Sequence, residues 1–173
     1  MEANIAANWL VPLLSGMAVA TLMSVATANA EGFARTDLRG LVQSNVEIGA
    51  SQYSTRAERK RLTLLCTTCI EFTAVDVLIG TSRDGTEGRY RSGATTLGRM
   101  EQICRASDDT CRLQALDIGG AVGWQSTYSD GSTSILFKDG DMLTIRAIAP
   151  SPREATQRNK AVLDALGKKI IGH

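Results

Sequence analysis

The chain has 173 residues, a formal net charge of +1 at pH 7 and 5% aromatic residues. Near-neutral charge argues against a nucleic-acid partner, and the scarcity of aromatic residues argues against stacking platforms for bases or sugars. The only histidine is the final residue, His173, which excludes a histidine general base, a Ser-His-Asp triad and a histidine metal site. We therefore expect no catalytic residue, no metal and no cofactor.

The first 30 residues have the pattern of a signal peptide. An apolar stretch from Trp9 to Val25 precedes Ala28-Asn29-Ala30, the small-x-small pattern of a signal-peptidase site. However, the start carries Glu2 and no Lys or Arg, and the apolar stretch is close to the ~20 residues that span a bilayer. We expect cleavage and a periplasmic or secreted protein. The alternative is a single-pass anchor at residues 9–28 that holds the domain outside the cytoplasm.

Residues 31–59 are mixed and polar, and we expect them to precede a single α+β domain over residues 60–173. The charge run from Thr55 to Arg61 is typical of a solvated surface. Residues 62–79 are rich in Leu, Val, Ile and Thr, and their alternation changes phase near Ala74. This predicts either a bulge or two separate strands. Asp-Gly and Glu-Gly pairs predict a loop over residues 80–93.

The spacing of the apolar residues next predicts a short helix over residues 96–106. Alternation then predicts three strands, over residues 121–129, 133–137 and 142–148. The segments between these strands contain Asp-Gly pairs, which favour tight turns. Because a tight turn reverses the chain, we expect the three strands to form an antiparallel meander.

The last segment begins with Ser151-Pro152-Arg153-Glu154, a capping box with proline at the first helical position. An apolar stripe follows at helical spacing and is wide enough to cover a sheet: Ala155, Val162, Leu163, Leu166 and Ile170. The expected fold is therefore α+β, with a small antiparallel meander of about 4–5 strands covered by this C-terminal helix. The short helix near residue 100 is expected to be tied by a disulfide.

Four cysteines lie after the leader: Cys66, Cys69, Cys104 and Cys111. An even number of cysteines in an exported chain predicts disulfides. The simplest pairing is local, Cys66 with Cys69 and Cys104 with Cys111. A bridge between the Cys66 region and the helix is the alternative, and the sequence leaves the pairing open.

Two other roles for the cysteines are disfavoured. A redox-active dithiol at Cys66 and Cys69 needs a lowered thiol pKa, which a helix N-terminus usually provides, but residues 70–79 have the composition of a strand. A zinc site with four thiolates would need closer spacing than the six residues between Cys104 and Cys111. An oxidising compartment also works against free thiolates.

These observations predict a non-enzymatic binding or accessory module that acts on a protein partner. The candidate contact residues belong to the charge run, together with a tryptophan beside a glycine pair: Arg56, Arg59, Lys60, Arg61 and Trp124. A core tryptophan packed in the sheet is the favoured alternative for Trp124. Two alternative functions are a thiol–disulfide redox protein that uses Cys66 and Cys69, and an anchored accessory subunit of a membrane complex.

The leader generates a simple prediction. Protein recovered from cells that export it should have an intact mass that corresponds to a chain beginning at Glu31, because cleavage follows Ala30. Intact-mass spectrometry of the soluble and membrane fractions measures this directly. A full-length mass confined to the membrane fraction would instead support the anchor.

Overall fold

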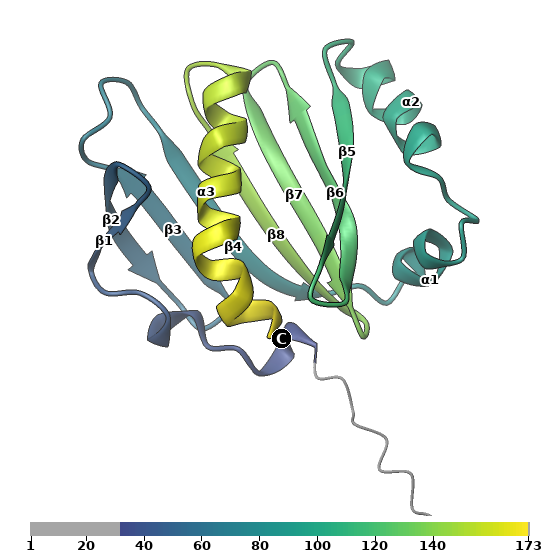
Figure 1. The fold of residues 1–173 in the computed structure, drawn as a ribbon, viewed down its shortest axis with the longest axis horizontal. Coiled ribbons are helices and arrows are strands. Elements are labelled where there is room, and N and C mark those ends of the chain that lie inside the picture. Colours follow the sequence, from purple (N-terminus) through teal and green to yellow (C-terminus); the bar gives the residue numbers. More distant parts are fainter. Residues whose placement is uncertain (1–31, 173) are drawn as a thin grey trace, which may run out of the picture.

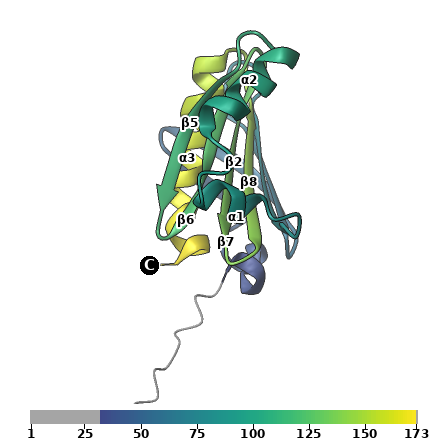
Figure 2. The same cartoon turned by 90° about the vertical axis from the view of Figure 1, so that its right-hand side faces the viewer.

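A computed structural model describes residues 32–172, so the leader and His173 lie outside the described residues. The chain forms one antiparallel sheet of eight strands in the order β1-β2-β3-β4-β8-β7-β6-β5. Helix α3 lies across one face of this sheet (Figure 1). Figure 2 shows the sheet nearly edge-on, with α3 on one side. Among residues 32–172, no helix has both the length and the apolar composition needed to cross a membrane.

The sheet consists of two four-stranded meanders. The first contains β1 (Asn45–Ile48), β2 (Ser51–Ala57), β3 (Arg61–Cys66) and β4 (Ala74–Thr81), and the short 3-10 turns η1 (Phe33–Arg35) and η2 (Leu38–Gly40) precede it. Two helices then follow, α1 (Thr86–Arg91) and α2 (Leu97–Ser107). The second meander contains β5 (Arg112–Ile118), β6 (Ala121–Tyr128), β7 (Gly131–Lys138) and β8 (Asp141–Ile148), and α3 (Pro152–Ile171) ends the fold.

The α+β class, the antiparallel sheet and its covering C-terminal helix are confirmed, but the expected number of strands is wrong. The sheet has eight strands rather than four or five. β1 and β2 come from residues 31–59, which were expected to be a mixed, polar segment before the domain. Each buries few large apolar side chains, with Ile48 in β1 and Tyr53 in β2. A strand with so few buried apolar side chains shows no clear alternation of apolar and polar residues. The sequence pattern therefore did not predict either strand.

The second difference is α1, which forms where the glycines predicted a loop. Glu87 and Arg91 form an i,i+4 ion pair at 2.8 Å along this helix. Tyr90 donates a hydrogen bond to the Gly123 carbonyl at 2.9 Å, and Arg91 donates one to Gly120 at 2.9 Å. The Glu87 carboxylate accepts hydrogen bonds from the amides of the β7–β8 turn. These contacts, distant in sequence, hold the short helix in place.

Antiparallel pairing of β4 with β8 joins the two meanders. The pairing extends over eight positions, from Ala74 opposite Ile148 to Thr81 opposite Asp141. Alternate side chains of both strands point toward α3 and are buried, including Val75, Val77 and Ile145. The core therefore lies between α3 and the middle of the sheet.

Helix α3 begins as the capping box predicts, but only half of the box forms. Ser151 Oγ accepts a hydrogen bond from the Glu154 amide at 3.2 Å, and Pro152 occupies the first helical position. The Glu154 carboxylate instead accepts a hydrogen bond from Arg158 at 3.1 Å. Every residue of the predicted apolar stripe is buried: Ala155, Val162, Leu163, Leu166 and Ile170.

A buried polar cluster fixes α3 to the sheet. Asn159 is fully buried among apolar side chains. Its Oδ1 accepts hydrogen bonds from Ser134 at 2.6 Å and Gln125 at 3.2 Å. Its Nδ2 donates to the carbonyls of Ser132 at 3.1 Å and Ile145 at 2.7 Å. The amide thus contacts β6, β7 and β8 at once, which fixes the position of the helix along the sheet.

The Asn159 cluster predicts a large loss of stability on substitution. Asn159→Leu should lower the free energy of unfolding by about 2–4 kcal/mol, because the partners of the amide would stay buried without hydrogen bonds. Gln157→Leu, on the exposed side of the same helix, is the matched control and should change little. Urea denaturation measures both variants. Equal effects would contradict the role assigned to the cluster.

Candidate functional site

The two faces of the sheet differ in how they are covered. In the central strands the residues that alternate with the core point away from α3, and they are half-buried or exposed. We call this surface the open face. It comprises Ser54 and Arg56 of β2, Arg61, Thr63 and Leu65 of β3, Ala74, Asp76 and Leu78 of β4, and Thr144, Arg146 and Ile148 of β8.

Strand register aligns three of the four charged residues of the open face in one row. Arg56 pairs with Thr63, Thr63 with Asp76, and Asp76 with Arg146. Thr63 Oγ1 donates a hydrogen bond to Asp76 at 2.6 Å. Arg61 lies 3.4 Å from the Asp76 carboxylate. The open face thus carries three arginines and one aspartate, so it attracts anionic groups.

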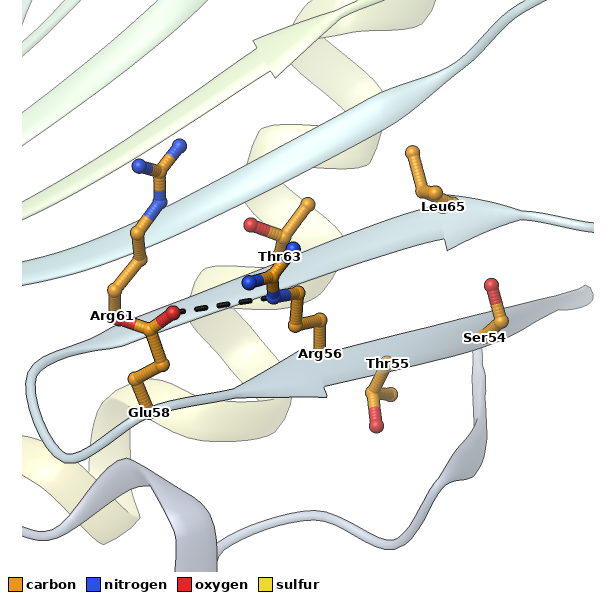
Figure 3. Close-up of a pocket in the computed structure, with 7 residues that line it drawn as sticks. All are labelled: Ser54, Thr55, Arg56, Glu58, Arg61, Thr63 and Leu65. Carbon is orange, nitrogen blue, oxygen red and sulfur yellow. Dashed lines mark ion pairs between the residues drawn. The ribbon is translucent and has the colours of Figure 1, made fainter.

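A groove of about 400 Å³ follows β2 and β3 on this surface (Figure 3). Its lining combines two guanidinium groups, three hydroxyls, one carboxylate and one leucine: Ser54, Thr55, Arg56, Glu58, Arg61, Thr63 and Leu65. Arg56 lies 3.9 Å from Glu58, a loose contact on the surface that holds neither side chain firmly. The Arg56 guanidinium is therefore available to bind a carboxylate, whereas Arg61 already contacts Asp76.

The open face becomes apolar toward the end of β3. Leu65 pairs with Ala74, and Ala74 pairs with Ile148, so the three form one row. Leu65 and Ile148 are exposed. Just beyond this row lies the loop of residues 67–73, which connects β3 to β4 and which we call the bridged loop. Its Ile70 and Phe72 are also exposed.

All four cysteines pair locally, Cys66 with Cys69 and Cys104 with Cys111. The Cys66–Cys69 bridge joins the end of β3 to the third residue of the bridged loop, and the chain continues from this loop into β4. Strands therefore flank this disulfide in the chain, so neither cysteine lies in the first turn of a helix, where the pKa of a reactive thiol is lowered. Residues 32–172 contain no group of three or more His, Cys, Asp or Glu side chains arranged to hold a metal ion.

The structure brings together only part of the charge run. Arg56 and Arg61 lie on the open face, whereas Arg59 is exposed in the turn between β2 and β3. Lys60 donates a hydrogen bond to the Thr36 carbonyl at 3.2 Å, toward the N-terminal segment. Sequence reasoning missed Arg146, which becomes a neighbour of Asp76 only through the β4–β8 pairing.

Trp124 lies on the same side of the sheet but apart from the arginines. It is half-buried between Tyr90 and Phe137, with ring centroids 5.5 Å away in each case. Burial raises the pKa of Tyr90 above its usual value. Gly123, which precedes Trp124 in β6, is required by packing, because a Cβ at this position would lie 1.9 Å from the Ile135 carbonyl oxygen. These aromatic contacts favour a packing role for Trp124.

No protein-family model, curated protein or solved structure matches this chain.

The open-face arginines should matter little for stability. Arg56→Gln combined with Arg61→Gln should change the free energy of unfolding by less than about 1 kcal/mol, because exposed ion pairs contribute little. Leu64→Ala, in the core beside them, should cost about 2–5 kcal/mol and serves as the contrast. Thermal and urea denaturation measure both. A loss as large as that of Leu64→Ala would mean that the arginines hold the fold together.

Proposed function

We propose that this protein is an exported, non-enzymatic module that binds a protein partner through its open face. The observation that carries the proposal is the unequal covering of the sheet. α3 buries one face of β4 and β8, while the other face presents three arginines beside exposed Leu65, Leu78 and Ile148. A mixed surface of arginine and large apolar side chains has the composition of protein interfaces.

Two features support export to the periplasm or outside the cell. The disulfides Cys66–Cys69 and Cys104–Cys111 fit an oxidising compartment, where such bonds form and persist. The leader pattern of residues 1–30 agrees with this, although it lies outside the described residues. An anchor at residues 9–28 would leave the open face and its proposed partner unchanged.

The redox alternative has less support than the binding role. In dithiol enzymes the reactive cysteine usually lies at the N-terminus of a helix, which stabilises its thiolate, whereas Cys66 ends β3 and Cys69 lies in the loop before β4. The bridge instead shapes a loop at the margin of the open face. We therefore assign Cys66 and Cys69 a structural role in the binding surface.

Site-specific photo-cross-linking in the exporting cell tests the proposal. A photoreactive amino acid in place of Leu78, on the open face, should give a discrete covalent product with a second protein. The same probe in place of Gln157, on the exposed side of α3, is the matched control and should give none. Adding Arg56→Gln, Arg61→Gln and Arg146→Gln should reduce the Leu78 product about tenfold or more, because charged contacts at interfaces contribute to affinity. Equal labelling at positions 78 and 157 would contradict the proposal.

A further inference from the structure

The bridged loop displays two large apolar side chains at the margin of the open face. Ile70 is 104% exposed and Phe72 is 70% exposed, so neither is used in packing this chain. Single exposed apolar residues are ordinary. Here the two lie two residues apart, in the loop that follows the row of exposed Leu65 and Ile148, and exposed apolar side chains gathered in one region are typical of interaction sites.

The loop is held in shape although its side chains are exposed. The Cys66–Cys69 bridge closes its first residues, with 5.6 Å between the two Cα atoms, and Ile70 follows directly after the bridge. Cys66 donates a backbone hydrogen bond to Thr73 at 3.0 Å, and Thr67 donates one to Gln52 of β2 at 2.9 Å. Thr68 Oγ1 accepts a hydrogen bond from the Gln52 amide at 3.1 Å. A loop fixed before binding loses little conformational entropy when it binds.

We propose that the bridged loop is the anchor of the binding surface, and that Ile70 and Phe72 enter an apolar pocket with a basic rim on the partner protein. This inference rests on the proposed function and adds the chemistry of the partner. Rigid apolar side chains that enter a pocket are the usual energetic centre of a protein interface.

The charges around the loop indicate the basic rim. The sequence of the loop, Thr67-Thr-Cys-Ile-Glu-Phe-Thr73, contains one charged residue, Glu71, placed between the two apolar ones. A shallow groove separates the loop from the start of α3, and Ile70, Glu71 and Glu154 line it. Arg158 in this groove is already paired with Glu154 at 3.1 Å. The remaining charge is the Glu71 carboxylate, which favours a basic partner surface.

The same charge disfavours a membrane as the occupant. Insertion of Ile70 and Phe72 into a bilayer would bring Glu71 against the headgroups, and anionic lipids repel a carboxylate. Loops that bind such membranes carry lysine or arginine beside their apolar residues, whereas residues 67–73 carry neither.

The loop and the arginines together define an oriented surface. Leu65, Ala74 and Ile148 connect the negative, apolar loop to the positive row of Arg56 and Arg146. A matching partner carries acidic groups opposite the arginines and basic groups around the pocket. Opposite charges at the two ends permit one orientation of the partner and penalise the reversed one.

Cross-linking with loop variants tests this anchor. The probe in place of Leu78 reports complex formation, and Ile70→Ser combined with Phe72→Ser should reduce its product about tenfold or more, as expected for a central apolar contact. Ile103→Ser, an apolar residue on α2 that is 63% exposed, is the matched control and should leave the product unchanged. Glu71→Lys should also reduce the product, and Glu71→Gln less so. Thermal unfolding of all variants should match the parent, since the replaced side chains are exposed.

The possible outcomes separate this inference from the proposed function. The loop variant could give as much cross-linked product from position 78 as the parent, while the arginine variant loses this product. That result would overturn the role of the bridged loop and would leave the binding function intact. Absence of any Leu78 product would overturn both. Sedimentation with vesicles of phosphatidylethanolamine and phosphatidylglycerol should show no binding, and binding that depends on Ile70 and Phe72 would overturn the protein pocket in favour of a membrane. A cross-linked second copy of this chain as the sole product would also overturn it.

Discussion

The pairing of β4 with β8 is the constraint on which the other features of the molecule depend. It joins two meanders that are far apart in sequence, and it places the buried residues of both under a single helix. Asn159 fixes that helix by contacting three strands of the second meander. Without the β4–β8 pairing, Asp76 would have no Arg146 beside it and Leu65 would have no row to share with Ile148. The β4–β8 pairing therefore creates both the core and the open face.

The two faces of the sheet around the β4–β8 pairing differ in polarity and in how they are covered. Under α3 the strands bury apolar side chains around the Asn159 amide, whose oxygen and nitrogen are both hydrogen-bonded, as expected for a stable core. On the other side, α1 and α2 cover the end of the sheet near β5 and β6, where Tyr90 packs on Trp124. The central strands keep their arginines and apolar side chains accessible. A fold that buries its core under one face of the sheet leaves the other face accessible, and the Cys66–Cys69 bridge constrains the start of the loop at the margin of that face.

Sequence patterns predicted the elements with strong local signals and missed those defined by long-range contacts. The capping box and apolar stripe located α3, and clear alternation between Asp-Gly turns located β6, β7 and β8. β2 was missed because Tyr53 is its only large buried side chain, and α1 was missed because its anchors, Gly120 and Gly140, lie far along the chain. For the candidate surface, the charge run identified Arg56 and Arg61. Arg146, Leu78 and Ile148 could not be grouped with them, since only the β4–β8 register makes them neighbours.

The proposed function requires a protein partner to cover the open face in the compartment where this chain works. Thiol accessibility tests it most directly, by comparing Leu78→Cys and Lys160→Cys in purified protein and in intact exporting cells. In purified protein, both introduced thiols should react readily with a membrane-permeant maleimide, because Leu78 and Lys160 are exposed. In cells, the account predicts protection at position 78 and full reaction at position 160. Equal reaction at both positions in cells would contradict it.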